Sequence, residues 1–493
     1  MLLSLLNALD VKSFLSFLFI SLLIFDIWKN KNAPNFPPGP WGFPFLGNVF
    51  FGFNYRAIDK VTEQFGNIFS LREGYDKIVL VSGYKLVKEV LVTQGDCFLD
   101  RLISPLFTEV FQGNGISLSN GYRWRKQRHF TASHLKTFSE GKKDMEFHIQ
   151  QECKFLCEAF EQEQGRPFNP RDIINNATAN VIGSFVFGKR LDFNGTDFQN
   201  LLHENSESAL LNNIPVIQLY RAFPWLVKRF HGSHETILSS YTKLTSFIKK
   251  RIEKQKKDWD PFDHRDFIDA YIGEIDKRRK DTEAAFTVDN LAFITVDLFK
   301  SGTQTMTDIL QWSLRLMIKY PKVQKKVQDE IDYVIGKLRH PCLADRGSMP
   351  YTNAVIHEIQ RVGNILPLIV PRLTSRDTTL SGYIIPKGTL VMCSLSSVLK
   401  DSSHWEKPNQ FYPEHFLDDQ RHFMKREAFY PFSAGKRACL GEQLARNALF
   451  LFFTSLLQRF SFSPPEGLEE PCFEPQEAVN VSPKPFQICG TLR

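Results

Sequence analysis

The sequence lacks any pair of cysteines at the C-x-x-C spacing that zinc sites and redox centres use. Its eight cysteines are scattered over 493 residues without the pattern of a disulfide framework, so we expect free thiols in a reducing compartment. Cys153 and Cys157 share one face of a predicted helix, but two ligands do not complete a zinc site. We therefore interpret this pair as structural.

A strong excess of charge of one sign is also missing. The 61 basic and 54 acidic residues leave a net charge of +7, which is too diffuse to indicate nucleic-acid binding. This balance fits an anionic membrane surface or an acidic partner. There is no internal repeat or low-complexity segment, and the 43% of hydrophobic residues, with 45 phenylalanines, can build a large core. The length allows two or three domains, or one large helical domain.

The N-terminus lacks the uninterrupted apolar run of roughly 20 residues that is typical of a spanning helix. Ser13–Phe25 is free of charge, and Ile27 and Trp28 extend the apolar character beyond Asp26. A cleaved signal peptide is the alternative, but no A-x-A-like site follows, and Lys residues after the tryptophan are typical of a cytoplasmic anchor boundary. We predict a signal anchor over 1–28, a basic and proline-rich hinge over 29–40, and a cytosolic domain over 41–493.

The rest of the chain predicts a mainly α fold with small β-sheets. Alternating apolar residues between glycines predict a hairpin over 66–82, and helical periodicity continues to about residue 362. Five prolines make the pattern irregular over 365–415. The apolar segment Leu211–Val227 is either buried core or an exposed membrane contact.

Phe432–Gly441 places Cys439 in a glycine-flanked loop, after two basic residues and before an apolar helical run. A thiolate needs such free backbone N–H groups, positive charge and a helix N-terminus. Gly435 and Gly441 are expected to let the backbone fold tightly around the sulfur. Taken alone, Cys439 would be interpreted as a buried structural cysteine.

The complete pattern F-x-x-G-x-R-x-C-x-G resembles the haem-binding loop of the cytochrome P450 family, the haem-thiolate monooxygenases. The resemblance implies a single large cytochrome P450 fold with haem b, in which Cys439 is the axial ligand of the iron and favours O–O cleavage. It also favours the membrane contact over buried core for the segment Leu211–Val227.

Glu358 and Arg361 stand three residues apart on one predicted helical face, which is ion-pair spacing and a weak signal alone. Their position before Cys439, with His415 in a P-E-H-F segment between, resembles the E-x-x-R network of this family. The resemblance implies a structural role, and a buried network stabilises a fold only when every member is satisfied.

Haem carries two propionates, so several cations are expected to converge on it, and arginine suits planar carboxylate recognition. Any one of these side chains could instead form a surface salt bridge. By their positions relative to the family pattern, the propionate-binding candidates are Arg101, Trp124, Arg128, Arg372 and Arg437.

The predicted distal helix, Asp297–Met317, departs from the family pattern. That pattern is a glycine, any residue, an acidic residue, a threonine and then a second residue with a hydroxyl group. Gly302 is expected to let the helix open over the iron, and Thr305 keeps the hydroxyl that serves proton delivery. Gln304 replaces the acid and Met306 the second hydroxyl. An amide orders water but cannot exchange protons as an acid does, so oxygen activation is expected to be less tightly coupled. Alternatively, the threonine hydroxyl bonds back to a backbone carbonyl.

Three runs, 266–271, 350–358 and 436–446, resemble the animal microsomal family two, and subfamily J most of all. That resemblance implies epoxidation and hydroxylation of polyunsaturated fatty acids and some xenobiotics at the endoplasmic reticulum membrane. Electrons would come from NADPH through NADPH–cytochrome P450 reductase, with cytochrome b5 as a further donor, and no nucleic acid is involved. The substrate-pocket candidates by family position are Ile103, Phe107, Leu298, Leu366, Ile369 and Val479.

Two rival functions stay open on the same fold. Gln304 and Met306 are compatible with a lipid peroxide isomerase that needs neither reductase nor dioxygen. A non-catalytic haem carrier or sensor has only the altered distal helix in its favour.

Overall fold

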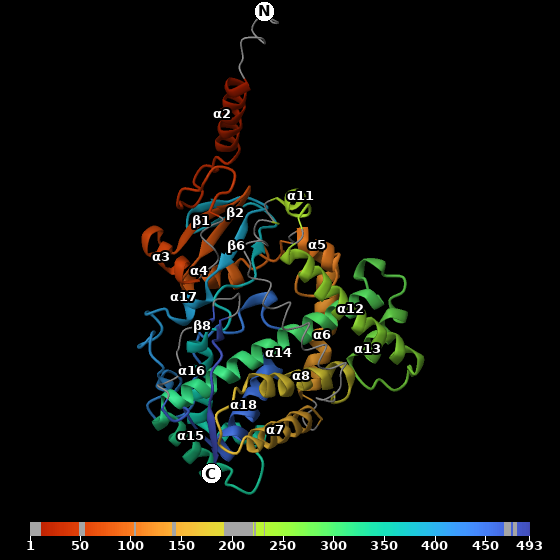
Figure 1. The fold of residues 1–493 in the computed structure, drawn as a ribbon, viewed down its shortest axis with the longest axis vertical. Helices are drawn as coiled ribbons and strands as arrows, with labels where there is room; N and C mark the ends of the chain where they lie inside the picture. Colours follow the sequence, from red (N-terminus) through yellow and green to blue (C-terminus); the bar gives the residue numbers. More distant parts are fainter. Residues whose placement is uncertain are drawn as a thin grey trace, which may run out of the picture.

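The computed structural model describes residues 11–48, 55–102, 105–140, 144–191, 220, 223–230, 232–467, 475–476 and 481–493. Helices dominate it (Figure 1). The α-helices are α2 Val11–Lys29, α3 Tyr55–Phe65, α4 Tyr84–Lys88, α5 Pro105–Phe111, α6 Gly121–Glu140, α7 Asp144–Gln162, α8 Arg171–Phe187, α11 Pro224–Val227, α12 Ser233–Lys257, α13 Phe267–Lys277, α14 Val288–Lys319, α15 Pro321–Val334, α16 Pro350–Gly363, α17 Leu395–Leu399 and α18 Glu442–Arg459. The strands are β1 Ile68–Glu73, β2 Asp76–Val81, β3 Arg372–Leu373, β4 Thr378–Leu380, β5 Tyr383–Ile385, β6 Leu390–Cys393, β7 Phe460–Ser463, β8 Pro475–Gln476, β9 Ser482–Pro483 and β10 Cys489–Leu492.

Helix α14 crosses the middle of the helical part, and α8, α12, α16 and α18 pack against it (Figure 1). Thr287 caps its start by accepting a hydrogen bond from the Asn290 N–H at 3.1 Å. Pro321 opens the following helix, because proline is tolerated in a first turn but not in a helix interior. Apolar side chains are buried along most of α14, so the helices packed around it hold it in place.

The main sheet has the strand order β1-β2-β6-β3. Strands β1 and β2 pair antiparallel with Ile68 opposite Val81, which confirms the hairpin predicted over 66–82. Strand β6 joins β2 in parallel, with Ile78 opposite Leu390. The proline-rich region after residue 365 therefore adds short strands to a sheet begun at the other end of the chain, which its irregular pattern did not predict.

Helix α2 projects from the end of the molecule that carries this sheet (Figure 1). Most of its apolar side chains are exposed. Among the described residues, no helix combines the length and apolarity needed to cross a bilayer. Residues 1–10 of the predicted anchor lie outside the described range, and the anchor and its boundaries stay predictions.

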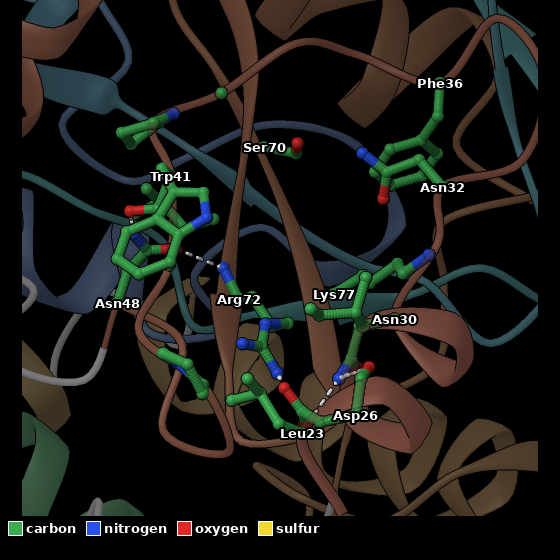
Figure 2. Close-up of a pocket in the computed structure, with 16 residues that line it drawn as sticks. Leu23, Asp26, Asn30, Asn32, Phe36, Trp41, Asn48, Ser70, Arg72 and Lys77 are labelled. Carbon is green, nitrogen blue, oxygen red and sulfur yellow. Dashed lines mark hydrogen bonds and ion pairs between the residues drawn. The ribbon is translucent and has the colours of Figure 1, made fainter. Parts of the chain in front are cut away.

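A buried acid attaches α2 to the sheet. Asp26 is 2% exposed and lies 3.5 Å from the Arg72 guanidinium of β1. It also accepts hydrogen bonds from the Phe45 N–H at 3.1 Å and the Asn30 side chain at 2.8 Å. These contacts border a cavity of about 410 Å³ beneath the helix, which Lys77 and other polar groups also line (Figure 2). The junction between predicted anchor and body is thus held by specific polar contacts.

The segment Leu211–Val227 is described only at residue 220 and from residue 223 onward. Within it, Trp225 of α11 is 72% exposed, whereas Val227 is buried. The membrane-contact interpretation of this segment stays a prediction. Cys153 and Cys157 are both buried free thiols on α7, where burial raises the pKa of each.

Candidate active site

The cysteine loop is closed by backbone hydrogen bonds. The Cys439 N–H donates to the Phe432 carbonyl at 2.9 Å, and the Ala438 N–H donates to the Gly435 carbonyl at 3.0 Å. A short 3-10 helix, Gly435–Arg437, precedes the cysteine, and α18 begins three residues after it. Cys439 therefore lies at a helix N-terminus, where the dipole favours negative charge on sulfur.

The two loop glycines have different roles. Gly435 has a φ of +74°, and a Cβ there would lie 1.9 Å from the carbonyl oxygen of Leu91, so no other residue fits without moving the backbone. Gly441 has a φ of −94°, and no atom of the described residues lies within 4 Å of a Cβ at its position. The expected steric role is thus found at Gly435 only, and Gly441 instead directs its N–H toward the sulfur.

Cys439 is solvent-accessible although protein surrounds it closely enough for burial to raise its pKa. The Gly441 N–H and the guanidinium groups of Arg128 and Arg446 act in the opposite direction. The sulfur is therefore enclosed without being covered by other side chains, which is what a metal-ligating thiol needs. Coordination would deprotonate it outright.

Arg437 joins the cysteine loop to three segments before it. Its guanidinium donates to the carbonyls of Leu99, Ile116 and Ser119 at 3.2, 3.2 and 2.7 Å. Its centre lies 3.8 Å from the ring centroid of Trp124 in α6. Burial, followed by the nearby guanidinium groups, lowers its pKa to about 9.

Three more arginines lie in the same region, and their positive charges repel one another. Burial lowers the pKa of Arg101 well below its usual value, and Arg372, Arg437 and Arg128 lower it further. Burial likewise lowers the pKa of Arg372 to about 10 and lowers that of Arg128. Arg128 donates to the Ala438 carbonyl at 2.7 Å, which holds α6 against the cysteine.

This cluster has the properties of an anion-binding site. Within the described residues, no carboxylate forms an ion pair with Arg101, Arg128, Arg372 or Arg437, although four like charges lie together. Three buried N–H groups, on the Nε atoms of Arg101 and Arg372 and the Nε1 atom of Trp124, have no hydrogen-bond partner in the part of the chain that the structure describes. Buried donors without partners are costly, so a ligand with several carboxylate oxygens fits this cluster. All five side chains expected from the sequence thus lie in one place.

The E-x-x-R pair forms a buried network between α16 and the segment that follows α17. Arg361 donates from Nε and Nη2 to the two Glu358 oxygens at 2.8 and 2.7 Å, and both side chains are fully buried. The remaining Arg361 donors reach the carbonyls of Leu399, Pro408 and Gln410. The guanidinium therefore has a full set of acceptors, which a buried ion pair requires.

His415 completes this network in one defined tautomer. The Lys407 N–H donates to His415 Nε2 at 3.1 Å, so the ring proton is on Nδ1, which lies 3.2 Å from Glu358 Oε2. Tyr412 adds a backbone N–H to the same carboxylate at 2.8 Å. Glu358 therefore fixes both α16 and the 3-10 helix Pro413–Phe416.

On the distal helix α14, the Thr305 hydroxyl donates to the Ser301 carbonyl at 2.6 Å, the arrangement that the sequence left as an alternative. Gly302 faces α8, and a Cβ there would lie 2.5 Å from Ile182 Cδ1. The glycine therefore permits close helix packing, and this contact accounts for it without any local opening of the helix. Gln304 donates to Asp308 at 2.9 Å.

Asp308 is the site residue that sequence reasoning missed. It is a buried acid four residues after Gln304, and that i,i+4 spacing was the available signal. Among the pocket candidates, Phe107 and Leu298 are partly buried beside the helical core, Leu366 is half-buried, and Ile369 is buried in a separate cluster beside the main sheet. Ile103 and Val479 lie outside the described residues.

The sequence of residues 37–490 matches the family model for Cytochrome P450. The chain belongs to the cytochrome P450 family. Among its relatives, cytochrome P450 2J2 of Homo sapiens is 45% identical over 95% of this chain and 94% of its own length. Cytochrome P450 2J1 of Oryctolagus cuniculus is 44% identical over 97% and 95%, and cytochrome P450 2D26 of Mus musculus is 41% identical over 98% and 99%.

This cytochrome P450 is accordingly a monooxygenase whose cofactor is haem b. The cysteine loop and the arginine cluster fit that cofactor. The loop supplies a thiol for the iron, and the positive charges of the cluster are complementary to the two carboxylates of the propionates. When bound, haem supplies the activation of dioxygen.

Proposed function

We propose that this chain is a microsomal haem-thiolate monooxygenase that inserts one oxygen atom from O₂ into an apolar substrate, with fatty acids as the foremost class. The observation that carries the proposal is the enclosed, accessible Cys439 beside the buried Arg101, Arg372 and Arg437 and the partly buried Arg128. None of these four arginines has a carboxylate partner within the described residues. Cys439 would ligate the iron, and Arg101, Arg128, Arg372 and Arg437, with the Trp124 N–H, would hold the propionates.

On the distal side, the Thr305 hydroxyl would hold a proton beside the haem site. This hydroxyl donates to the Ser301 carbonyl, which leaves the oxygen lone pairs available to accept from a proton donor. The apolar side chains of Phe107, Leu298 and Leu366 would exclude water and orient the substrate.

The electron donor would be an NADPH-dependent flavoprotein reductase, with cytochrome b5 as a second donor. Helix α6 lies against the cysteine loop through Arg128, and its exposed residues Arg125 and Lys136 give that face basic groups. A basic face steers an acidic partner. Lys436 adds to this face only partly, because it pairs with Asp96 at 2.5 Å.

The location would be the endoplasmic reticulum membrane, with the body facing the cytosol. Supporting observations are the exposed apolar side chains of α2, the exposed Trp28 at its end, and Lys29 in its last turn.

A lipid peroxide isomerase is the second candidate function. It is favoured by Gln304, which leaves no acid at the position where the family pattern has one.

The deciding experiment uses full-length haem protein reconstituted with reductase in lipid vesicles. We expect fatty acid products only with NADPH and reductase, and a strongly red-shifted Soret band of the reduced carbon monoxide adduct that Cys439→His loses. Conversion of lipid hydroperoxides without NADPH, at a rate equal to or above NADPH-supported turnover, would favour the isomerase. Persistence of the band in Cys439→His would overturn the thiolate assignment.

A further inference from the structure

The distal helix carries a buried acid one turn beyond the amide at position 304. Gln304 donates from Nε2 to Asp308 Oδ1 at 2.9 Å. Asp308 is 1% exposed, and its Oδ2 has no well-formed hydrogen-bond partner within the described residues. A buried carboxylate with one unsatisfied oxygen is costly, so a neutral form of this acid is accessible.

The elements packed on Asp308 offer it little positive charge. Arg171 at the start of α8 is the one cation that acts on it within the described residues, Ser482 of β9 contributes a hydroxyl, and α14 itself contributes Gln304. The neighbouring contact between α8 and α14 at Thr307 is neutral, because the hydroxyl groups of Thr307 and Thr178 lie 2.8 Å apart. Burial raises the pKa of Asp308 to about 7, and the other three groups offset only part of the rise.

We propose that Asp308 is a positioning residue that sets which end of the Gln304 amide is free on the distal helix. An ionised Asp308 accepts from Nε2, as in the structure, and leaves the amide oxygen as the free end. A protonated Asp308 donates to the amide oxygen instead, so the amide turns over and Nε2 becomes free. The two arrangements differ by one proton, which Asp308 exchanges with water, and no bond in the amide changes.

The consequence for turnover rests on the proposed proton-holding role of Thr305. A free Nε2 donates to a water molecule, which leaves both water protons available to pass toward the threonine hydroxyl. A free amide oxygen instead accepts a proton of that water and orients it away. Product formed per NADPH consumed is therefore highest with neutral Asp308 and falls as pH rises through about 7.

The first test follows the carboxyl group itself in the haem-loaded protein, without turnover. An infrared pH titration should show the C=O band of a protonated carboxyl that disappears as pH rises from about 6 to about 8. Asp308→Asn should lose this band. Asp297→Asn, which removes another carboxyl of α14 that is partly buried, should keep it. Absence of a titrating band that depends on Asp308 would overturn the proposal.

The second test connects Asp308 to Gln304. The neutral fraction of Asp308 changes roughly tenfold between one pH unit below and one above its pKa. Product per NADPH should decline over this range in the wild type, and the decline should be absent in both Asp308→Asn and Gln304→Met. Gln304→Met should nevertheless keep the infrared band, because its acid is intact. A full decline in Gln304→Met would show that the amide does not transmit the effect.

Failure of the proposed function would be visible separately. If Thr305→Val leaves product per NADPH unchanged, the proton-holding role of Thr305 is wrong. The infrared titration of Asp308 and its dependence on position 308 do not rely on that role.

Discussion

The guanidinium of Arg437 lies 3.8 Å from the ring centroid of Trp124, so the cysteine loop stacks on helix α6. The same guanidinium donates to three backbone carbonyls, which use its planar fork of N–H groups. Trp124 keeps its own N–H free of protein partners within the described residues. One face of this pair thus fixes the loop while the other is available to a ligand.

We predict that Arg437→Lys lowers haem retention although it conserves the charge. Lysine lacks the planar fork, so several buried carbonyls lose their donor, at a cost of about 1–3 kcal/mol each. The ratio of Soret to protein absorbance after dialysis measures retention, and thermal unfolding measures stability. Arg279→Lys, at an exposed arginine, is the matched control and should behave as wild type. Equal retention in both variants would refute the role given to the fork.

Glu358→Gln should destabilise the protein strongly. The amide cannot compensate the buried Arg361 charge, and breaking a buried pair typically costs about 3–5 kcal/mol. His415→Asn should cost less, because the Glu358–Arg361 pair and its carbonyl acceptors persist. Urea unfolding measures the free energy of unfolding of both variants. A larger decrease for His415→Asn than for Glu358→Gln would contradict this order.

On the distal helix, we expect Thr305→Val to divert electrons from product to hydrogen peroxide. Valine keeps the shape but removes the hydroxyl. Gln304→Glu should instead raise the amount of product relative to hydrogen peroxide. The new carboxylate and that of Asp308 would lie within hydrogen-bond distance and share a proton, which keeps an exchangeable acid near neutral pH. Product and peroxide per NADPH are the measurements. A lower product yield in Gln304→Glu would count against proton delivery through this position.

The basic face beside the cysteine predicts a salt-dependent reduction rate. Charge reversal by Arg125→Glu together with Lys136→Glu should slow reduction by the flavoprotein roughly tenfold at low salt, and less at high salt. Turnover supported by peroxide should stay unchanged. Lys256→Glu on α12, a helix packed on the distal side, is the control. Equal loss in both assays would indicate misfolding rather than a lost docking site.

Asp26→Asn should loosen α2 from the body. The variant removes the charge that faces Arg72, and a local loss of about 1.4 kcal/mol would speed cleavage from the opened state roughly tenfold. Limited proteolysis in the hinge over 29–40, followed by mass spectrometry, measures this. Glu63→Gln, at an exposed acid of α3, should show no change. Unchanged cleavage in Asp26→Asn would show that other contacts hold the helix.

Local patterns were sufficient to predict the hairpin and the helical character of the chain. For Glu358 and Arg361, spacing within one helix was only a weak signal, and the resemblance to the family's E-x-x-R pattern identified the pair. The packing role of Gly302 could not be predicted in this way, because it depends on contact with Ile182 of another helix. The acid at Asp308 was overlooked because its burial arises from the packing of α8 and β9 on α14. Contacts between distant segments, rather than propensity, decide these positions.

The arginine cluster has a consequence for biosynthesis. Four guanidinium groups held together repel one another, and an anionic cofactor relieves that repulsion only in the folded state. Binding of this kind adds its free energy to folding by mass action. Maturation of the polypeptide should therefore follow the cellular supply of haem, and chains made when haem is scarce should be the ones that proteases remove first.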